Sequence, residues 1–353
     1  MKKFNLAILR NEWSDDYFLW QKSCERFPDK IAYDVINFTS NNWLDECTRK
    51  NYDMYLLKPP GFTNLLKQVY DERVIILANS LQKRIYPSLT EELIYENKRF
   101  FLSWLNANEL PYPKTSIYFN KEEAINFINE NQLPLVIKLN TGASGAGVKI
   151  FYNKSEIIDF VDKIFSNKGT TGRWGPNLAR GKLLKRGFNY ILHPNQISGK
   201  LKIYKTRKSD VQKGFVIFQE YIKHDFEWRI VVIGDSYFAH KKLKLNEKAS
   251  GSLLKKYDNP PLYIFDFAKK IMERFGFYSQ AIDAFEIEPG KLLINEMQCI
   301  FGQSDPYQML VNGEPGRYRF VNDKWHFEEG DYTNNECFDL RVKHIISLLE
   351  NSK

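Results

Sequence analysis

The stretch LVIKLNTGASGAGVKIF (residues 135–151) places a lysine and three glycines between two short apolar runs. Each run has the length and composition of a β-strand, and Lys138 ends the first one. Glycines let backbone N–H groups approach an anion without a Cβ clash, and a lysine adds a compact charge for phosphate oxygens. A tight hairpin with an exposed lysine is the alternative. The loop joins two strands and opens no helix, so it is neither a dinucleotide-binding fingerprint nor a P-loop.

Patterns on both sides of this loop predict alternating strands and helices, an α/β (α+β) protein. Before residue 90 the strands are expected at 4–9, 31–38, 54–57 and 74–77, with helical spacing between them. A helix is expected from 89 to about 110, where prolines follow. Further strands are expected at 116–119, 135–139, 148–152 and 215–222, helices at 121–131, 155–165, 262–275 and from 334 onward, and hairpins at 227–244 and 280–297.

The composition is that of a globular protein with one strongly basic segment. The 353 residues are 43% apolar and 27% charged, enough for two or three packed units, and no run is long and apolar enough to span a membrane. Four scattered cysteines favour a reducing cytoplasm, and five scattered histidines do not predict a transition-metal site. Residues 166–213 hold twelve Lys or Arg and the single acid Asp210, a balance of +11. Such a segment attracts anions, or it is a solvated loop.

A second group of polar residues stands on the last predicted hairpin. With the turn at its Pro-Gly pair, Asp283 and Glu296 come opposite each other. Strict alternation would place Leu292 and Ile294 on the same face as Glu296 and Gln298. Two acids on so apolar a hairpin repel each other and lose hydration unless a cation lies between them. Mg²⁺ bound by carboxylates and phosphates would resolve that conflict; solvated surface acids are the alternative.

Between these groups lie the stretches FQEYI (218–222) and EWRIVVIG (227–234). With the lysine and glycine loop before them and the acidic hairpin after them, they resemble the ATP-grasp superfamily over residues 90–310. In that superfamily a lysine-bearing strand and a glycine loop cover the phosphates of ATP, and an Asp with a Glu-x-Asn pair binds the metal ions. The resemblance implies the ATP-grasp fold, preceded by a small Rossmann-like domain, with ATP and Mg²⁺ as cofactors.

The resemblance also implies a role for each matching residue. The phosphates would meet Lys98 and Lys138, and catalysis would use Lys138 and Arg229, which neutralises the transferred phosphoryl group. The loop would contribute Gly142, Ser144, Gly145 and Gly147 to the phosphate site. The adenine would contact Glu220, Tyr221 and Ile222, and the ribose would contact Asp225 or Glu227. The metal would be bound by Asp283, Glu296 and Gln298. Gln298 stands where the family has Asn, which puts the second metal's geometry in question. The nearby Lys241, Lys242 and Lys244 would add charge to the phosphate site or form a solvated edge.

The same resemblance divides the chain into three parts. Residues 1–88 would form the N-terminal domain, 89–310 the ATP-grasp domain, and 311–353 a C-terminal extension with a helix. A subdomain at about 114–218 would carry the glycine loop and contain the basic segment. Short stretches at 249–252, 280–283 and 316–318 resemble a branch of the superfamily associated with bacterial surface polysaccharide synthesis.

The implied activity is ligation: ATP converts a substrate carboxylate to an acyl phosphate, and an amine attacks it to give an amide. Positioning and charge neutralisation carry such chemistry. A kinase on the same fold and a non-catalytic binder of an acidic polymer are the alternatives. The basic segment favours an anionic small molecule or glycan as substrate. Nucleic acid is not expected as a partner, a homodimer is left open, and the expected location is the cytoplasm.

Overall fold

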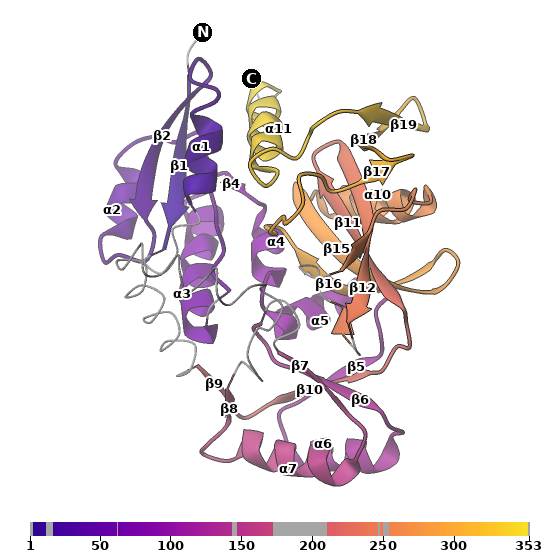
Figure 1. Cartoon of the computed structure of the whole chain (residues 1–353). Helices are drawn as coiled ribbons and strands as arrows, with labels where there is room; N and C mark the ends of the chain where they lie inside the picture. The colour runs from indigo at the N-terminus through magenta and orange to yellow at the C-terminus, as the bar shows by residue number, and fades with distance from the viewer. Residues whose placement is uncertain are drawn as a thin grey trace, which may run out of the picture.

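The computed structural model describes residues 3–11, 17–61, 63–142, 147–171, 210–245, 248–249 and 254–351. Within them the chain forms an N-terminal unit, a small middle sheet with two helices, and a large antiparallel sheet (Figure 1). None of the described helices combines the length and the apolar character that a membrane span requires.

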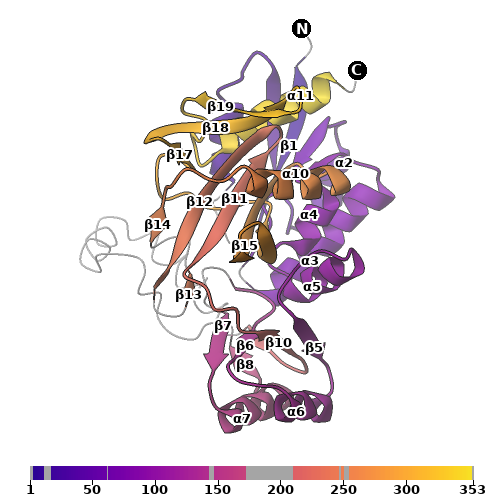
Figure 2. The same cartoon turned by 90° about the vertical axis from the view of Figure 1, so that its right-hand side faces the viewer.

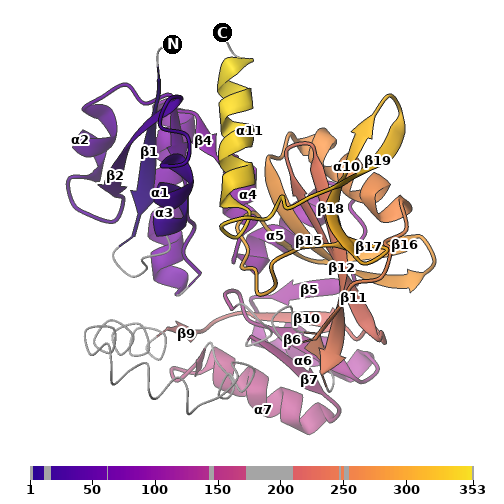
Figure 3. The same cartoon turned by 45° about the horizontal axis from the view of Figure 1, so that its top comes forward.

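A parallel sheet with the strand order β2-β1-β3-β4 forms the N-terminal unit. Leu6 and Ile8 of β1 pack on one face of this sheet, and Ala7 and Leu9 pack on the other, as expected for a strand covered on both sides. The C-terminal helix covers the first face (Figure 3). The elements are β1 (Phe4–Arg10), α1 (Phe18–Cys24), β2 (Ile31–Asn37), α2 (Trp43–Thr48), β3 (Met54–Leu56), α3 (Asn64–Ile75), β4 (Ile85–Tyr86) and the C-terminal α11 (Phe338–Glu350).

The fourth strand of this unit is not at 74–77, where an apolar run predicted it, but at Ile85–Tyr86. Val74 and Leu77 are fully buried and continue the buried stripe of α3, whereas the two residues between them are each 38% exposed. A π-helical turn, Ile76–Ser80, then ends the helix. The run is apolar throughout, but only its helical face enters the core.

The helix predicted from 89 to 110 is broken into two, α4 (Leu89–Ile94) and α5 (Lys98–Ala107). Glu96 in the break has a left-handed backbone, with φ +49°, and the side chain of Asn97 caps α5. Because of this break, α5 begins beside the glycine loop.

The glycine loop belongs to the middle sheet, whose strand order is β5-β10-β6-β7. Strands β6 and β7 are antiparallel neighbours, so the loop connects the two strands of a hairpin, as predicted. The bounds are β5 (Thr115–Tyr118), α6 (Lys121–Glu130), β6 (Leu135–Lys138), β7 (Val148–Phe151), α7 (Lys154–Phe165), β8 (Thr170–Thr171), β9 (Val211–Gln212) and β10 (Val216–Glu220). Helices α6 and α7 share its hydrophobic core. Most of the basic segment, residues 172–209, lies outside the described part of the chain.

The large sheet follows the path β16-β15-β11-β12-β18-β17, with β13 and β14 beside β12 and β19 beside β18. Helix α10 packs on one face and ends at Gly276, whose φ is +61° (Figure 2). The two predicted hairpins supply four consecutive strands of this path, β16-β15-β11-β12. The bounds are β11 (Phe226–Ile233), β12 (Ser236–Leu245), β13 (Lys248–Ala249), β14 (Lys255–Lys256), α10 (Tyr263–Phe275), β15 (Ser279–Glu288), β16 (Lys291–Gln298), β17 (Leu310–Val311), β18 (Glu314–Val321) and β19 (Lys324–Glu329).

Candidate functional site

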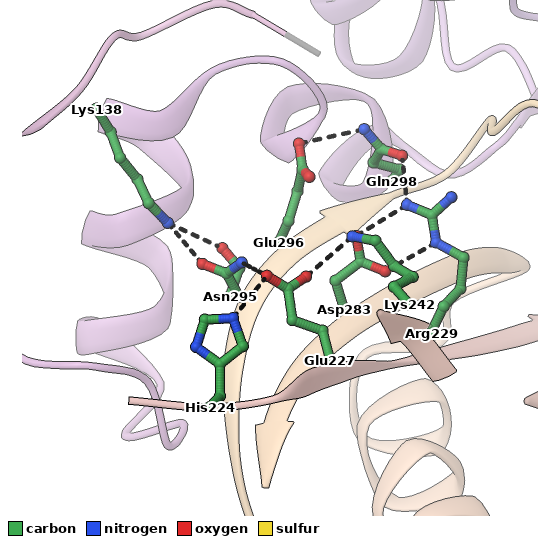
Figure 4. Close-up of polar contacts among 9 residues, drawn as sticks. All are labelled: Lys138, His224, Glu227, Arg229, Lys242, Asp283, Asn295, Glu296 and Gln298. Atoms are coloured by element: carbon green, nitrogen blue, oxygen red, sulfur yellow. Dashed lines mark hydrogen bonds and ion pairs between the residues drawn. The ribbon is translucent and has the colours of Figure 1, made fainter. Parts of the chain in front are cut away.

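One face of the large sheet carries a row of ionisable side chains. Arg229 on β11 pairs directly with Asp283 on β15, which pairs with Glu296 on β16. The adjacent residues Ile230 and Ile282 belong to the hydrophobic core that includes α10. Because side chains alternate across a strand, the three ionisable groups stand together on the face away from α10 (Figure 4).

An irregularity in β16 decides which of its side chains reach that face. Asp283 lies opposite Glu296, but the next residue, Ala284, lies opposite Ile294, so Asn295 is an extra residue in the ladder. Ile294 is therefore on the core side and 1% exposed, which corrects the face that strict alternation predicted for it. The bulge brings Asn295 to the polar side together with Glu296 (Figure 4).

Two cations hold the carboxylate of Asp283. Arg229 donates from Nε to Oδ1 and from Nη2 to Oδ2, both at 2.8 Å, and Lys242 on β12 donates from Nζ to Oδ2 at 2.7 Å. Lys242 also donates to Glu227 Oε2 at 2.9 Å. Burial raises the pKa of Asp283, but the two cations outweigh burial and hold the pKa well below its usual value. Asp283 is therefore ionised and keeps both cations in place.

Lys138 reaches the same cluster from the middle sheet. Its Nζ donates to Asn295 Oδ1 at 2.6 Å, and Asn295 Nδ2 donates to Glu227 Oε1 at 3.2 Å (Figure 4). Among the described residues no carboxylate forms an ion pair with Lys138. Burial lowers the pKa of Lys138 to about 8, and the charge of Lys98 contributes to the shift. An anion placed beside Lys138 would restore its charge.

Glu296 lacks a cation of its own among the described residues. Its Oε1 accepts from Gln298 Nε2 at 3.2 Å, and Gln298 Oε1 lies 3.4 Å from Arg229 Nη2. Burial raises the pKa of Glu296, and the carboxylates of Asp283 and Glu96 raise it further, although Lys98 opposes them. A carboxylate in such surroundings gains from a bound cation.

Oxygen atoms of Asp283, Glu296 and Gln298 form a donor set of the kind that Mg²⁺ prefers. In the described ranges no three His, Cys, Asp or Glu side chains gather closely enough to hold a metal ion. Mg²⁺ does not require such a group, because it is commonly bound by one or two carboxylates and by substrate phosphates. Mg²⁺ would fit better at Glu296 than at Asp283, because both carboxylate oxygens of Asp283 are already bonded to cations.

The first glycine of the loop is anchored to the start of α5. The N–H of Gly142 donates to Glu96 Oε2 at 2.8 Å, and its carbonyl oxygen accepts from Lys98 Nζ at 3.4 Å. The backbone N–H of Lys98 donates to Asn140 O at 3.1 Å. These bonds bring Lys98 and the loop together.

The far end of the loop is closely packed. A Cβ on Gly147 would lie 3.2 Å from Leu139 Cβ and 3.2 Å from Thr141 O, so a larger residue would push the two ends of the loop apart. Ser144 and Gly145, predicted to contact phosphates, lie outside the described residues.

Of the three acids on the segment from β10 to β11, one enters the cluster. The side chain of Glu220 is exposed and accepts from the backbone N–H of Lys114 at 2.7 Å, and Asp225 is exposed as well. Glu227 is 5% exposed and contacts the lysine of β12 described above. Of the two residues proposed for the ribose, the structure places Glu227 with the other polar groups.

The predicted adenine segment is held by neighbouring side chains. The hydroxyl of Tyr221 accepts from Lys244 Nζ at 3.1 Å. The carbonyl oxygen of Ile222 accepts from His224 Nδ1 at 2.7 Å, and His224 Nε2 lies 3.9 Å from Glu227 Oε1 (Figure 4). The segment is thus connected to the polar cluster through His224.

Two members of the cluster were left undecided or missed by sequence reasoning. The lysine run near β12 had two interpretations, and the structure divides it: Lys242 joins the cluster, and Lys241 lies on the other face, 5.1 Å from the ring of Trp228. In the predicted hairpin, pairing residues outward from the turn at Gly234 places Lys242 opposite Glu227, so the sequence held a signal for this contact. Asn295 was missed because a bulge leaves no mark in the alternation of apolar residues.

Comparison with known proteins bears on the fold. No protein-family model and no curated protein matches the sequence. D-alanine–D-alanine ligase from Bacillus anthracis has a TM-score of 0.54 at 14% identity, over 99% of this chain and 100% of that one. N5-carboxyaminoimidazole ribonucleotide synthetase from Thermotoga maritima has a TM-score of 0.55 at 12% identity, over 97% of this chain and 76% of that one. The N5-carboxyaminoimidazole synthase from Aspergillus clavatus, in complex with ADP and 5-aminoimidazole ribonucleotide, has a TM-score of 0.56 at 10% identity, over 98% of this chain and 77% of that one. At these identities the likeness shows the fold: the chain has the ATP-grasp fold.

Proposed function

We propose that this chain is an ATP-dependent, Mg²⁺-using ligase that activates a substrate carboxylate as an acyl phosphate and joins it to an amine. The observation that carries the proposal is the convergence of Lys138, Arg229 and Lys242 on one buried face, beside a carboxylate, Glu296, that has no ion-pair partner among the described residues. Three fixed cations suit a polyphosphate, and the remaining acid suits the metal that accompanies it. The ligases with the same fold add support.

In the first step an oxygen of the substrate carboxylate attacks the γ-phosphorus of ATP, and ADP leaves with the bridging oxygen. Arg229 and Lys242 stand where they would neutralise the oxygens of the transferred group, and Lys138 would bind the phosphates nearer the glycine loop. Bound through Glu296 and Gln298, Mg²⁺ would neutralise phosphate charge.

In the second step the amine nitrogen attacks the acyl carbon. The new C–N bond forms, the C–O bond to phosphate breaks, inorganic phosphate leaves, and the nitrogen loses its proton to solvent. No covalent bond to a protein side chain is needed, so the chain's own part is to hold the groups in place and keep the acyl phosphate from water.

Product analysis tests the proposal. The protein is incubated with Mg-ATP and a panel of carboxylic acids and amines, and the products are examined by mass spectrometry. A ligase gives a product whose mass is the acid plus the amine minus water, with ADP and phosphate formed in equal amount. A persistent phosphorylated acceptor without amide would identify a kinase. Salt-sensitive binding of an acidic polymer with no ATP consumption would identify a binder and contradict both enzyme assignments.

Lys138→Met is expected to weaken ATP binding and to remove part of its pH dependence. With its pKa near 8, Lys138 of the free protein loses its charge between pH 7 and 9, while the terminal phosphate is already ionised because its second pKa is about 6. The affinity of the wild type for Mg-ATP should therefore fall as pH rises from 7 to 9. Calorimetric titration at both pH values checks this result. An equal slope in Lys138→Met would assign the effect to another group.

The finer assignments rest on sequence. The balance of +11 in residues 166–213 supports an anionic acid or glycan precursor as substrate. A role in bacterial surface polysaccharide synthesis follows from the short resemblances described above, and the cytoplasm is the location that the cysteine content favours. A homodimer remains a proposal.

A further inference from the structure

His240 stands next to Arg229 in the row of polar side chains, and the proposed mechanism does not use it. It lies on β12 directly opposite Arg229, so it faces the same side of the sheet as Asp283 and Glu296. The side chain is 1% exposed. What could bind beside the phosphoryl site therefore depends on what the two ring nitrogens contact.

The contact made by one nitrogen fixes the state of the other. His240 Nδ1 lies 2.8 Å from the carbonyl oxygen of Gln308, and a carbonyl only accepts, so Nδ1 carries the hydrogen. Nε2 then presents a lone pair, and among the residues that the structure describes this buried atom has no hydrogen-bond partner. Burial lowers the pKa of His240 to about 3, and Arg229 and Lys255 contribute, against the opposing effects of the Gln308 carbonyl and Asp283. The ring is therefore a neutral acceptor.

An acid with a free oxygen accompanies this acceptor. The ring of Tyr257 lies 5.3 Å from that of His240, and its hydroxyl donates to Asp305 Oδ2 at 2.6 Å. Lys255 Nζ donates to the same oxygen at 2.9 Å. In the described part of the chain no group donates to Oδ1 of Asp305, whose side chain is 38% exposed. Asp305 lies close enough to His240 that a charge on the ring would lower the pKa of the Asp305 carboxyl.

We propose that His240 and Asp305 form the subsite for the second substrate, and that this substrate is a primary amine that enters as an ammonium group. One N–H of the amine donates to Nε2 of His240, and its charge pairs with Oδ1 of Asp305. The assignment of this ligand as the attacking nucleophile rests on the proposed function, because Arg229 then holds the phosphoryl group beside it. The ammonium group first releases one proton to solvent, which frees the lone pair of the nitrogen for attack. The neutral lone pair of Nε2 and the carboxylate of Asp305 favour an N–H donor over an oxyanion, against the nearby charges of Arg229 and Lys255.

Entry to the subsite requires a local movement, because the ring is buried in the free protein. The segment beside it is held by side-chain contacts: Gln308 Nε2 donates to Gln303 Oε1 at 3.3 Å, and Gln303 Nε2 donates to Asp305 O at 2.8 Å. Such bonds can exchange without unfolding a strand.

Nitrogen NMR of protein labelled with ¹⁵N-histidine tests the subsite with methylammonium as the probe and acetate as the contrasting ion at equal ionic strength. His240→Asn identifies the resonance and keeps a side-chain N–H for the Gln308 carbonyl. We expect methylammonium to shift the Nε2 resonance of His240 saturably, acetate to leave it unchanged, and neither ion to move His344, a half-buried histidine that lies beside Tyr86.

Asp305→Asn should weaken methylammonium binding about 10–100-fold, because a charged hydrogen bond is replaced by a neutral one. An Nε2 resonance that ignores methylammonium, or follows acetate equally, would overturn the subsite. The measurement needs no turnover, so a protein that binds methylammonium here yet forms no amide would contradict the ligase proposal and leave the subsite standing.

Discussion

Glu296→Gln is expected to lower ATP-dependent product formation by at least about 10²–10³-fold, the loss typical of removing one fixed electrostatic group from a site. The amide keeps the shape of the side chain and removes the charge that would hold Mg²⁺ against the phosphates. Neither Gln298, an amide, nor Asp283, already paired with two cations, can replace it. Rates at saturating Mg²⁺ and ATP, measured by mass spectrometry, give the comparison.

The same substitution should leave the free protein as stable as before, or more stable. The folded-state pKa of Glu296 is raised by burial, so the native state binds more protons than the unfolded state above the acid's usual pKa. The charge of Glu296 therefore costs stability as pH rises through that window, and glutamine removes this cost. Thermal unfolding without nucleotide measures it.

Glu288→Gln is the matched control for this prediction, because Glu288 is exposed near the turn of the same hairpin. It should change neither rate nor stability. Full activity in Glu296→Gln would remove Glu296 from the metal assignment, and a large fall in its unfolding temperature would show that the carboxylate serves the fold.

The parts of the site that sequence reasoning found depend on local geometry. A lysine at a strand end followed by glycines needs only the strand and the loop to be placed, and both are local. The pairing of Asp283 with Glu296 agrees with the register counted from the short turn, because the two irregularities of the ladder between the turn and this pair offset each other.

The parts that escaped depend on tertiary structure. The bulge at Asn295 is set by how β16 packs against the core and against Lys138, which lies 157 positions earlier. The run at 74–77 has the composition of a strand, and only its place in the N-terminal core makes it helical. His240 carried no signal because an isolated histidine is uninformative until the register places it beside Arg229.

A second buried group of charges, outside the candidate site, joins α3 to α4. Lys67 on α3 donates to the carboxylate of Asp71, to Glu92 O at 2.8 Å and to Glu92 Oε1 at 3.3 Å. The side chains of Lys67 and Glu92 are 3% and 0% exposed. Burial raises the pKa of both acids, that of Glu92 to about 8, although Lys67 lowers them. One cation thus serves two acids.

Lys67→Met is expected to lower the free energy of unfolding by about 3–5 kcal/mol, the usual cost of leaving a buried charge without its partner. Since a domain is stable by only about 5–15 kcal/mol, this loss would leave little margin. Urea denaturation followed by circular dichroism measures it. The loss should be smaller at pH 5 than at pH 8, because Lys67 lowers the folded-state pKa of both acids and its removal raises these values further. A folded-state pKa raised further above the unfolded value costs more stability as pH rises.

The exposed pair Lys121–Asp162, at 2.9 Å, supplies the control for this last prediction: Lys121→Met should cost no more than about 1 kcal/mol. Adding Glu92→Gln to Lys67→Met should recover part of the stability lost at pH 8, because one of the two acids left without a cation is gone and the amide can still accept a hydrogen bond. The double variant should also show a weaker dependence on pH than Lys67→Met alone. If Lys67→Met proves as mild as Lys121→Met at pH 8, the two acids are protonated in the native protein and Lys67 is not their counter-ion.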